Sequence, residues 1–223
     1  IHTVNTINRS KPPKRWIYEL AISVGKSHYS RKKTGSRVPF FLSLIKSALC
    51  PVYHFIRKSI NMNRTKVLFS GGGPLSLEVS HFYGSIDVRL LEGYGLTETS
   101  PIVNVNRPGS NRPGTVGPPI KGVEERISDE GEILIRGDMV FKGYYRDDGQ
   151  NMEEAFTPDG FFRTGDVGVL NEDGTLTITS RLKDLIITSA GKNIAPQRIE
   201  RLFDNDEYID YFCVVGDKRK YLT

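Results

Sequence analysis

Cysteine is scarce in this chain of 223 residues, which contains only Cys50 and Cys213. Two cysteines so far apart form neither a disulfide framework nor a cysteine-rich metal site. Their scarcity excludes the small secreted classes that depend on disulfides, and it indicates a reducing compartment, so we expect a cytoplasmic location. The sequence places no acidic partner with His28, His54 or His81, and we interpret these histidines as structural or solvated.

An uninterrupted apolar segment is also missing. The longest apolar stretch, residues 38–60, is broken by polar residues and one proline, namely Lys46, Pro51, His54, Arg57 and Lys58. A membrane-spanning helix needs about 20 consecutive apolar residues, so we predict none here, and we find no signal peptide pattern ahead of the stretch. The apolar share of 38% beside 26% charged residues is typical of a globular chain with a substantial core.

Acidic residues are nearly absent from residues 1–66, where only Glu19 stands beside fourteen lysines and arginines. Residues 67–223 carry twenty-five acids and seventeen basic residues, so the net charge of +5 combines a basic arm with an acidic body. A basic arm can bind nucleic acid or an anionic membrane surface, or it can cover an anionic ligand. We expect no specific nucleic acid and favour peripheral association with a membrane.

Three helices are predicted within the basic arm. Residues 16–24 have apolar side chains at helical spacing, and residues 40–49 and 52–60 form two further helices divided at Pro51. The basic, glycine-broken residues 29–37 are predicted to be a loop.

From residue 66 the pattern changes to short strands and glycine turns. A buried strand, Val67–Ser70, opens into Gly71-Gly72-Gly73, and Pro74 suits the first position of a helix that extends to about Tyr83. A second apolar run ends in Glu92-Gly93-Tyr94-Gly95. Strand, glycine loop, helix and strand make a parallel α/β unit, so both glycine loops should lie at the carboxyl edge of one sheet, where ligands bind.

The segment after Gly95 places three hydroxyl groups around one carboxylate, in the order Thr97, Glu98, Thr99 and Ser100. Hydroxyl and main-chain N–H groups can hold phosphoryl oxygens, and a single carboxylate can hold Mg²⁺ beside them. A solvated polar loop is an equally good interpretation of this segment when it is taken alone.

The rest of the chain is predicted to form a small β subdomain and then a second domain. Charged residues 180–184 interrupt the pattern, so we place a domain boundary near Arg181 and expect domains at 1–65, 66–180 and 181–223. The predicted elements are a strand at 132–136, a hairpin of 167–170 with 175–179 across the turn 171–174, a β element at 185–187, a helix at 196–203 and a strand at 212–215.

Five motifs in this order resemble the AMP-forming (adenylate-forming) acyl-CoA synthetase superfamily, most closely its long-chain fatty-acid–CoA ligases. They are Gly71–Leu75, Glu92–Glu98, Phe162–Asp166, Arg181–Asp184 and Gly191–Pro196. The closest local matches are Ser189–Gln197 and Val215–Thr223. The resemblance implies an α/β fold: the rear part of a large N-terminal domain, made of a parallel α/β unit and a β subdomain, followed by the start of a small α+β C-terminal domain.

The resemblance also implies an activity, in which ATP and Mg²⁺ activate a long-chain fatty acid to an acyl-adenylate and CoA then displaces AMP. It places Gly71–Pro74 against the adenine, and Tyr94 with Gly95 beside the adenine and the acyl carbonyl. It places Thr97 on the phosphate and Glu98 on Mg²⁺. Phosphoryl-group transfer depends on such positioning and charge neutralisation more than on a protein nucleophile.

The remaining site residues follow from the same resemblance. Asp166 and Arg181 would hold the ribose hydroxyls, and Lys183 matches the hinge about which the C-terminal domain swings. Gly191 and Asn193 would contact CoA. Glu92, Gly93 and Ile178 complete the implied nucleotide-binding set.

Two motifs of the family are absent from these residues: the Ser/Thr/Gly-rich loop ending in Pro-Lys-Gly, and the late Gly-Lys motif with the lysine that promotes adenylation. We therefore expect the middle and rear of a longer ligase, and weak or no ligase activity from the isolated chain. One alternative is a truncated, non-catalytic remnant that binds nucleotide or a partner. Another is a different adenylate-forming enzyme, such as a medium-chain ligase or a peptide-synthetase adenylation domain.

Overall fold

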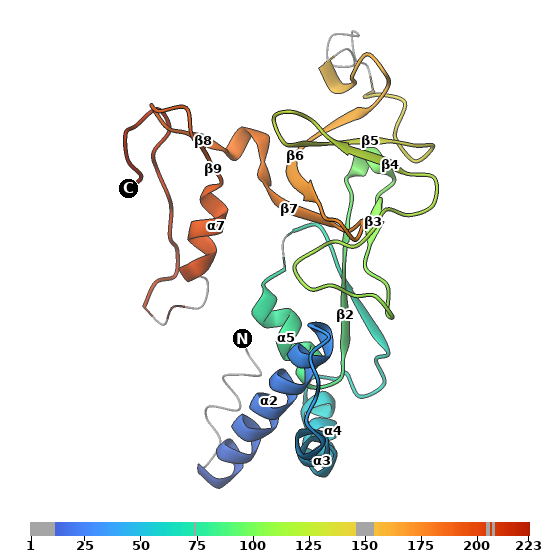
Figure 1. The fold of residues 1–223 in the computed structure, drawn as a ribbon, viewed down its shortest axis with the longest axis vertical. Coiled ribbons are helices and arrows are strands. Elements are labelled where there is room, and N and C mark those ends of the chain that lie inside the picture. Colours follow the sequence, from blue (N-terminus) through green and yellow to red (C-terminus); the bar gives the residue numbers. More distant parts are fainter. Residues whose placement is uncertain (1–11, 74, 146–153, 204–205, 207) are drawn as a thin grey trace. The chain divides into compact units, whose positions relative to one another are not determined.

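The computed structural model describes residues 12–73, 75–145, 154–203, 206 and 208–223 (Figure 1). The chain divides into two compact units. The first unit comprises residues 1–93 and 106–114, and the second comprises residues 94–105 and 115–223. The predicted boundary near Arg181 falls inside the second unit and stays a prediction.

In the first unit, the described residues form four helices and a pair of strands. The helices are α2 (Pro12–Lys33), α3 (Phe40–Ala48), α4 (Cys50–Ser59) and α5 (Leu77–Ser85), and the strands are β1 (Val67–Ser70) and β2 (Arg89–Tyr94). The division between α3 and α4 at Leu49, just ahead of Pro51, confirms the predicted break. Among the described residues, no helix combines the length and apolar character needed to cross a bilayer.

Helix α2 is longer than the sequence indicated. A loop was predicted at residues 29–37, but residues 29–33 form the last part of this helix, so the prediction is wrong for them. Packing on α5 explains the difference. The ring of Tyr29 lies over Gly84, and it meets the ring of His81 edge-on with their centroids 5.8 Å apart. These tertiary contacts stabilise a helical turn whose own sequence favours a loop.

The core of the first unit forms where α2 crosses α4 and α5. Its buried members are Ala21, Tyr53, Ile56, Ile86 and Val88. The buried Tyr53 hydroxyl donates to the carbonyl oxygen of Ala21 at 2.7 Å, so burial leaves this hydroxyl paired. Gly25 lets α2 approach α5, because a Cβ atom there would lie 2.4 Å from the Ser85 carbonyl oxygen.

Strands β1 and β2 pair in parallel, as the sequence predicted, with Val67 opposite Arg89 and Ser70 opposite Glu92. The following helix begins later than expected. The Ser76 side chain caps α5 by accepting the N–H of Glu78 at 3.2 Å, so the helix starts at Leu77 rather than at residue 74. Pro74 itself lies outside the described residues.

The second unit is built on a four-stranded antiparallel sheet of order β4-β5-β6-β7. The strands are β4 (Glu124–Ile127), β5 (Glu132–Arg136), β6 (Phe162–Leu170) and β7 (Leu176–Arg181). Strand β5 and the β6–β7 hairpin confirm the predictions. The buried members of its core are Tyr94, Val103, Ile133, Ile135 and Leu176.

The short strand β3 (Asn104–Val105) also belongs to the second unit. The N–H of Val103 donates to the Tyr94 carbonyl at 2.8 Å, and the N–H of Ile120 donates to the Val103 carbonyl at 2.8 Å. These bonds fix the segment that follows the hydroxyl-rich loop.

The chain continues through a hairpin of β8 (Ile186–Ile187) and β9 (Asn193–Ile194), then α7 (Pro196–Glu200) and a 3₁₀ turn, Arg201–Phe203. This agrees with the predicted β element and helix. The strand predicted at residues 212–215 is wrong. Val215 exchanges two backbone hydrogen bonds with Thr223, at 2.9 and 2.8 Å, but an isolated pair does not make a ladder.

Candidate functional site

The carboxyl edge of the parallel pair in the first unit brings the two glycine loops together. The strands end in register at Ser70 and Glu92, and a Cβ atom on Gly71 would lie 3.3 Å from the carbonyl oxygen of Gly93. The three glycines 71–73 are exposed. Main-chain atoms that no side chain covers are therefore exposed at this edge. The strand–loop pattern of the sequence predicted that the two glycine loops would lie there.

Glu92 has a structural part in the first unit. Its carbonyl oxygen accepts the N–H of Asn106 at 2.9 Å, and its carboxylate accepts the N–H of Gly114 at 3.3 Å. The side chain is buried, so these bonds tie residues 106–114 to β2. A contact of Glu92 with nucleotide stays a prediction.

In the second unit, three predicted site residues form one hydrogen-bonded network. The Tyr94 hydroxyl donates to Oδ2 of Asp166 at 2.7 Å, and Nε of Arg181 lies 3.3 Å from Oδ1 of the same carboxylate. Asp166 and Arg181 are direct cross-strand partners on β6 and β7. Tyr94 and Asp166 are buried, whereas the Arg181 side chain is 56% exposed.

Burial keeps the Tyr94 phenol protonated. It raises the pKa of Tyr94 far above its ordinary value, and the adjacent charge of Asp166 raises it further. The phenol is therefore a permanent donor, and Asp166 remains an acceptor with lone pairs to spare. A carboxylate that can still accept hydrogen bonds, with an exposed guanidinium beside it, can bind the two hydroxyl groups of a vicinal diol such as that of ribose.

The loop after Tyr94 is held closely against the chain that follows it. A Cβ atom on Gly95 would lie 1.8 Å from the Pro101 carbonyl oxygen, so only glycine fits there. The Thr99 hydroxyl accepts the Leu96 N–H at 2.9 Å. The buried hydroxyl of Thr99 is thus used internally, whereas Thr97 is exposed in the same 3₁₀ turn (Thr97–Thr99).

Glu98 is fixed at both its backbone and its side chain. Its carbonyl oxygen accepts the N–H of Phe141 at 2.8 Å, and its carboxylate accepts the Tyr144 hydroxyl at 3.0 Å. The described residues contain no group of three or more His, Cys, Asp or Glu side chains that could hold a metal ion. One oriented carboxylate fits Mg²⁺, which is usually held by one or two carboxylates together with substrate phosphates.

The sequence did not identify the side chains that hold this network in place. The Thr164 hydroxyl accepts the N–H of Asp166 at 3.1 Å and donates to the Ile133 carbonyl at 2.7 Å. The buried carboxylate of Glu132 accepts the N–H of Gly165 at 2.9 Å and pairs with Arg163 at 3.1 Å. Thr164 belongs to the motif Phe162–Asp166, but its bond to the Ile133 carbonyl spans 31 residues. The bonds of Glu132 to Gly165 and of Tyr144 to Glu98 also span 33 and 46 residues, so no local pattern reveals these contacts.

The predicted hinge lies on a short 3₁₀ turn, Leu182–Asp184, directly after Arg181. Lys183 is exposed. Gln197 of α7 spans the turn: its amide accepts the Ser180 hydroxyl at 3.1 Å and donates to the Asp184 carboxylate at 3.0 Å. Rotation about this turn would have to break those two bonds.

The other predicted residues of the second unit lie outside the Tyr94 network. Ile178 is half-buried against the core. Gly191 has a φ of 74° in an exposed turn, and Asn193 follows it on β9. The turn is secured by the N–H of Ser189, which donates to the Arg219 carbonyl at 3.0 Å.

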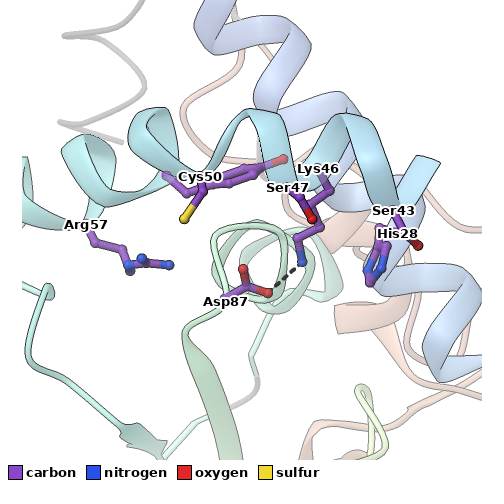
Figure 2. A pocket seen from close by; sticks show the side chains of 8 residues that line it. His28, Ser43, Lys46, Ser47, Cys50, Arg57 and Asp87 are labelled. Carbon is purple, nitrogen blue, oxygen red and sulfur yellow. Dashed lines mark hydrogen bonds and ion pairs between the residues drawn. The ribbon is translucent and has the colours of Figure 1, made fainter. Parts of the chain in front are cut away.

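A pocket of about 250 Å³ lies within the first unit (Figure 2). Two of its basic side chains are already paired. Lys46 bonds the Asp87 carboxylate at 2.6 Å, and Arg57 donates to the Ile86 carbonyl at 2.8 Å. Burial, followed by the nearby charge of Lys46, lowers the pKa of His28, which favours its neutral form. None of the predicted nucleotide-binding residues lines this pocket.

The chain matches a known family over more than half of its length. The sequence profile described as AMP-binding enzyme matches residues 17–145. The long-chain-fatty-acid–CoA ligase FadD15 of Mycobacterium tuberculosis is 43% identical over 171 residues, which cover 77% of this chain and 28% of the relative. The Drosophila melanogaster long-chain-fatty-acid–CoA ligase heimdall is 34% identical over 221 residues, covering 96% of this chain and 32% of the relative.

Solved structures give the same assignment of fold. ATP-bound MatB from Rhodopseudomonas palustris is 32% identical, with a TM-score of 0.63 over 74% of this chain and 36% of MatB. The O-succinylbenzoate coenzyme A synthetase MenE from Bacillus subtilis, in complex with ATP and magnesium ion, is 25% identical with a TM-score of 0.63, covering 81% of this chain and 43% of MenE. The chain spans about 30% of the length of the two ligase relatives.

Proposed function

Because the chain belongs to the family of AMP-binding enzymes, we propose that it forms the nucleotide-binding part of a ligase that activates a long-chain fatty acid and transfers it to CoA. The acid's carboxylate attacks the α-phosphorus of ATP and pyrophosphate leaves. The thiol of CoA then displaces AMP from the acyl-adenylate. The 43% identity to FadD15 supports a long-chain acid over other acids.

The observation that carries this proposal is the Tyr94–Asp166–Arg181 network. Asp166 accepts the ribose hydroxyls, Arg181 neutralises its charge, and the Tyr94 hydroxyl holds the carboxylate in place. Preorganised groups of this kind lose little entropy when ligand binds, which favours affinity.

The other residues take the roles that their environments permit. The exposed glycines 71–73 offer a flat backbone surface to the adenine ring, and the exposed Thr97 offers a hydroxyl to the phosphate. Glu98, oriented by Tyr144, would hold Mg²⁺, which supplies charge neutralisation at the phosphates when it is bound. Lys183 is the hinge, and Gly191 with Asn193 contacts CoA in the thioester-forming state.

Catalytic competence can be tested with a chimera. The segment of M. tuberculosis FadD15 that aligns with this chain is replaced by the matching residues of this chain, and palmitoyl-CoA formation is measured. Activity within about tenfold of FadD15 is expected, with loss of activity in the Asp166→Ala chimera. A folded chimera that binds AMP but forms no palmitoyl-adenylate would instead support the alternative of a non-catalytic, nucleotide-binding remnant.

The 223-residue chain alone is expected to bind AMP without forming acyl-CoA, since it spans about 30% of the ligase relatives. Steady thioester formation by the chain alone would contradict this part of the proposal. The class of acid is tested separately, by comparing palmitate, octanoate and an amino acid as substrates of the longer ligase in which this chain is proposed to lie. The comparison is needed because the family also contains medium-chain and amino-acid-activating enzymes.

We also propose a peripheral membrane location on the cytoplasmic side, through the basic arm. Three aromatic side chains of α2 and α3 are exposed, Trp16 at 69%, Phe40 at 82% and Phe41 at 64%. The last turn of α2 adds Arg31, Lys32 and Lys33. A segment that exposes both aromatic rings and cations suits the interface of an anionic bilayer. Cosedimentation with phosphatidylserine vesicles, compared with phosphatidylcholine vesicles, tests this, and equal binding to both would contradict it.

A further inference from the structure

Three buried oxygen atoms in the second unit have no hydrogen-bond partner. They are Oδ1 of Asn104 and both carboxyl oxygens of Glu125, and they are the only such side-chain atoms among the described residues. Buried acceptors without donors are costly, and a buried carboxylate without a donor is more costly still. That all three belong to two neighbouring residues calls for a single explanation.

The strand register places the Glu125 side chain on the core face of β4. Its cross-strand partner is the fully buried Ile135, and directly opposed residues of antiparallel strands share a face. Val123 and Ile127, two residues to either side, pack on the same core. Glu125 therefore introduces a carboxyl group into an otherwise apolar layer.

The Asn104 side chain, on β3, lies near this carboxyl. Its amide Nδ2 donates to the Gly117 carbonyl at 3.2 Å, which fixes the orientation of the amide and leaves Oδ1 as an acceptor. A carboxylate is an acceptor only, so it cannot bond to Oδ1, whereas a protonated carboxyl group has one O–H to donate.

We propose that Glu125 is a neutral carboxylic acid in the folded chain and donates a hydrogen bond to Oδ1 of Asn104, joining β3 to β4. This bond makes Glu125 a positioning residue. It holds the second-unit segment 94–105, which carries Tyr94, Thr97 and Glu98, on the four-stranded sheet.

The surroundings of Glu125 favour the neutral form. Burial raises the pKa of Glu125 to about 7 and outweighs hydrogen bonding to the Asn104 side chain, which lowers this pKa. The titratable group that faces it is the phenol of Tyr94, beyond which lie Asp166 and Arg181. The core side chains of β5 and β7 are apolar, namely Ile133, Ile135, Leu176 and Ile178.

The charged neighbours of Glu125 on β4 are paired elsewhere. Glu124 pairs with Arg136, and Arg126 pairs with Asp159 at 2.7 Å. Both residues are exposed, on the opposite face of the strand. Among the described residues, no cation contributes to the pKa of Glu125, so ionisation would leave a buried carboxylate without a charged partner.

The direction of the pH effect follows from the two pKa values. Between the ordinary glutamate value near 4.5 and about 7, the folded chain binds a proton that the unfolded chain has released. The stability of the second unit should therefore fall as pH rises through this window and level off above it.

The test combines carboxyl NMR of the ¹³C-glutamate-labelled chain with urea denaturation at pH 4.5 to 8. We expect the Glu125 carboxyl carbon, assigned through its own backbone, to titrate near pH 7. Across that range the unfolding constant should rise about 100-fold more in the wild type than in Glu125→Gln, whose amide donates at every pH. Glu124→Gln, on the opposite face of the same strand, is the matched control and should keep the wild-type dependence.

A Glu125 carboxyl that titrates near 4.5 would overturn the inference, as would a Glu125→Gln chain with the wild-type pH dependence. If Glu125→Gln does not fold, the wild-type carboxyl titration decides alone. AMP affinity is measured in parallel. Because Glu125 would hold the segment that carries Tyr94, AMP binding should weaken between pH 6.5 and 8. Only this last expectation rests on the proposed function. A carboxyl that titrates near 7 in a chain that never binds AMP would leave this inference standing and reject that function.

Discussion

The helical core of the first unit and the candidate site of the second unit use side-chain hydrogen bonds in different ways. In the first unit, Tyr53 donates to the Ala21 carbonyl and Arg57 to the Ile86 carbonyl, so side chains bond to backbone and fix the helices. In the second unit, Tyr94, Asp166 and Arg181 bond to one another between strands. Side-chain carboxylate and guanidinium groups can be shared with a ligand, whereas backbone carbonyls committed to packing cannot. The second unit therefore carries the recognition chemistry.

The units also use glycine to different ends. Gly25 permits the packing of two helices, whereas Gly95 lets a loop that carries candidate ligand-binding groups turn back on itself. Because the chain divides into two compact units, we expect a substitution at either glycine to destabilise only the unit that contains it.

The largest effect is expected from Gly95→Ala. The added Cβ atom would lie 1.8 Å from the Pro101 carbonyl oxygen and 2.6 Å from its carbon, both backbone atoms that side-chain movement cannot relieve. We expect the second unit to lose about 3 kcal/mol of unfolding free energy. AMP binding should be lost with it. Hydrogen exchange at β6 and β7 should rise while exchange at α2 stays unchanged. Gly109→Ala, where no atom lies within 4 Å, is the control.

Gly25→Ala should have the next largest effect, confined to the first unit. Alanine favours a helix over glycine by about 1 kcal/mol. The new Cβ atom would, however, lie 2.4 Å from the Ser85 carbonyl oxygen, and separating α2 from α5 costs more. We expect a net loss of about 2 kcal/mol, with faster exchange at α2 and α5 only. Faster exchange at β6 would show that the units are energetically coupled.

Tyr94→Phe tests the buried network without introducing a clash. It removes the donor to Asp166 and leaves that buried carboxylate with less stabilisation, at a cost of about 2 kcal/mol. Urea denaturation measures the loss. Tyr144→Phe, which removes a donor to Glu98 from a half-exposed side chain, should cost less than about 1 kcal/mol. Equal costs would mean that burial adds nothing to the Tyr94 bond.

The smallest effect is expected from Asp87→Asn in the first unit. The Lys46–Asp87 pair joins side chains that are 14% and 54% exposed, and ion pairs open to solvent contribute about 0–1 kcal/mol. Asparagine tolerates the φ of 60° at this position, so the backbone is not strained. A loss above about 2 kcal/mol on urea denaturation would show that this pair matters as much as the Tyr94 network.

Much of the fold could be predicted because its signals are local. Pro51 divides two helices, alternation with the Asn171–Gly174 turn predicts the β6–β7 hairpin, and a strand leading into glycines predicts the parallel pair. One error arose where a distant contact decides, because Tyr29 extends α2 by packing on Gly84. The other arose from a local cap that was overlooked: Ser76 caps α5, which therefore starts at Leu77, three residues after the predicted start.

The candidate site shows the same division. The motifs identified Tyr94, Asp166 and Arg181, and the hairpin register places the last two opposite each other. The supporting roles of Thr164, Glu132 and Gln197 were not identified, because each bonds to a partner that only the folded chain brings near. The buried Glu125 was also missed, since a glutamate beside Glu124 and Arg126 resembles part of a solvated strand face.

The most direct test of the account compares AMP with 2′,3′-dideoxy-AMP by titration calorimetry, using the wild-type chain and Asp166→Ala. If Asp166 holds the ribose hydroxyls, loss of those hydroxyls should weaken binding to the wild type by about 10- to 100-fold. Asp166→Ala should bind both nucleotides equally weakly, while Asp159→Asn, an exposed aspartate in the same unit, should behave as the wild type. The same penalty for the missing hydroxyls in wild type and Asp166→Ala would contradict the assignment of the ribose site.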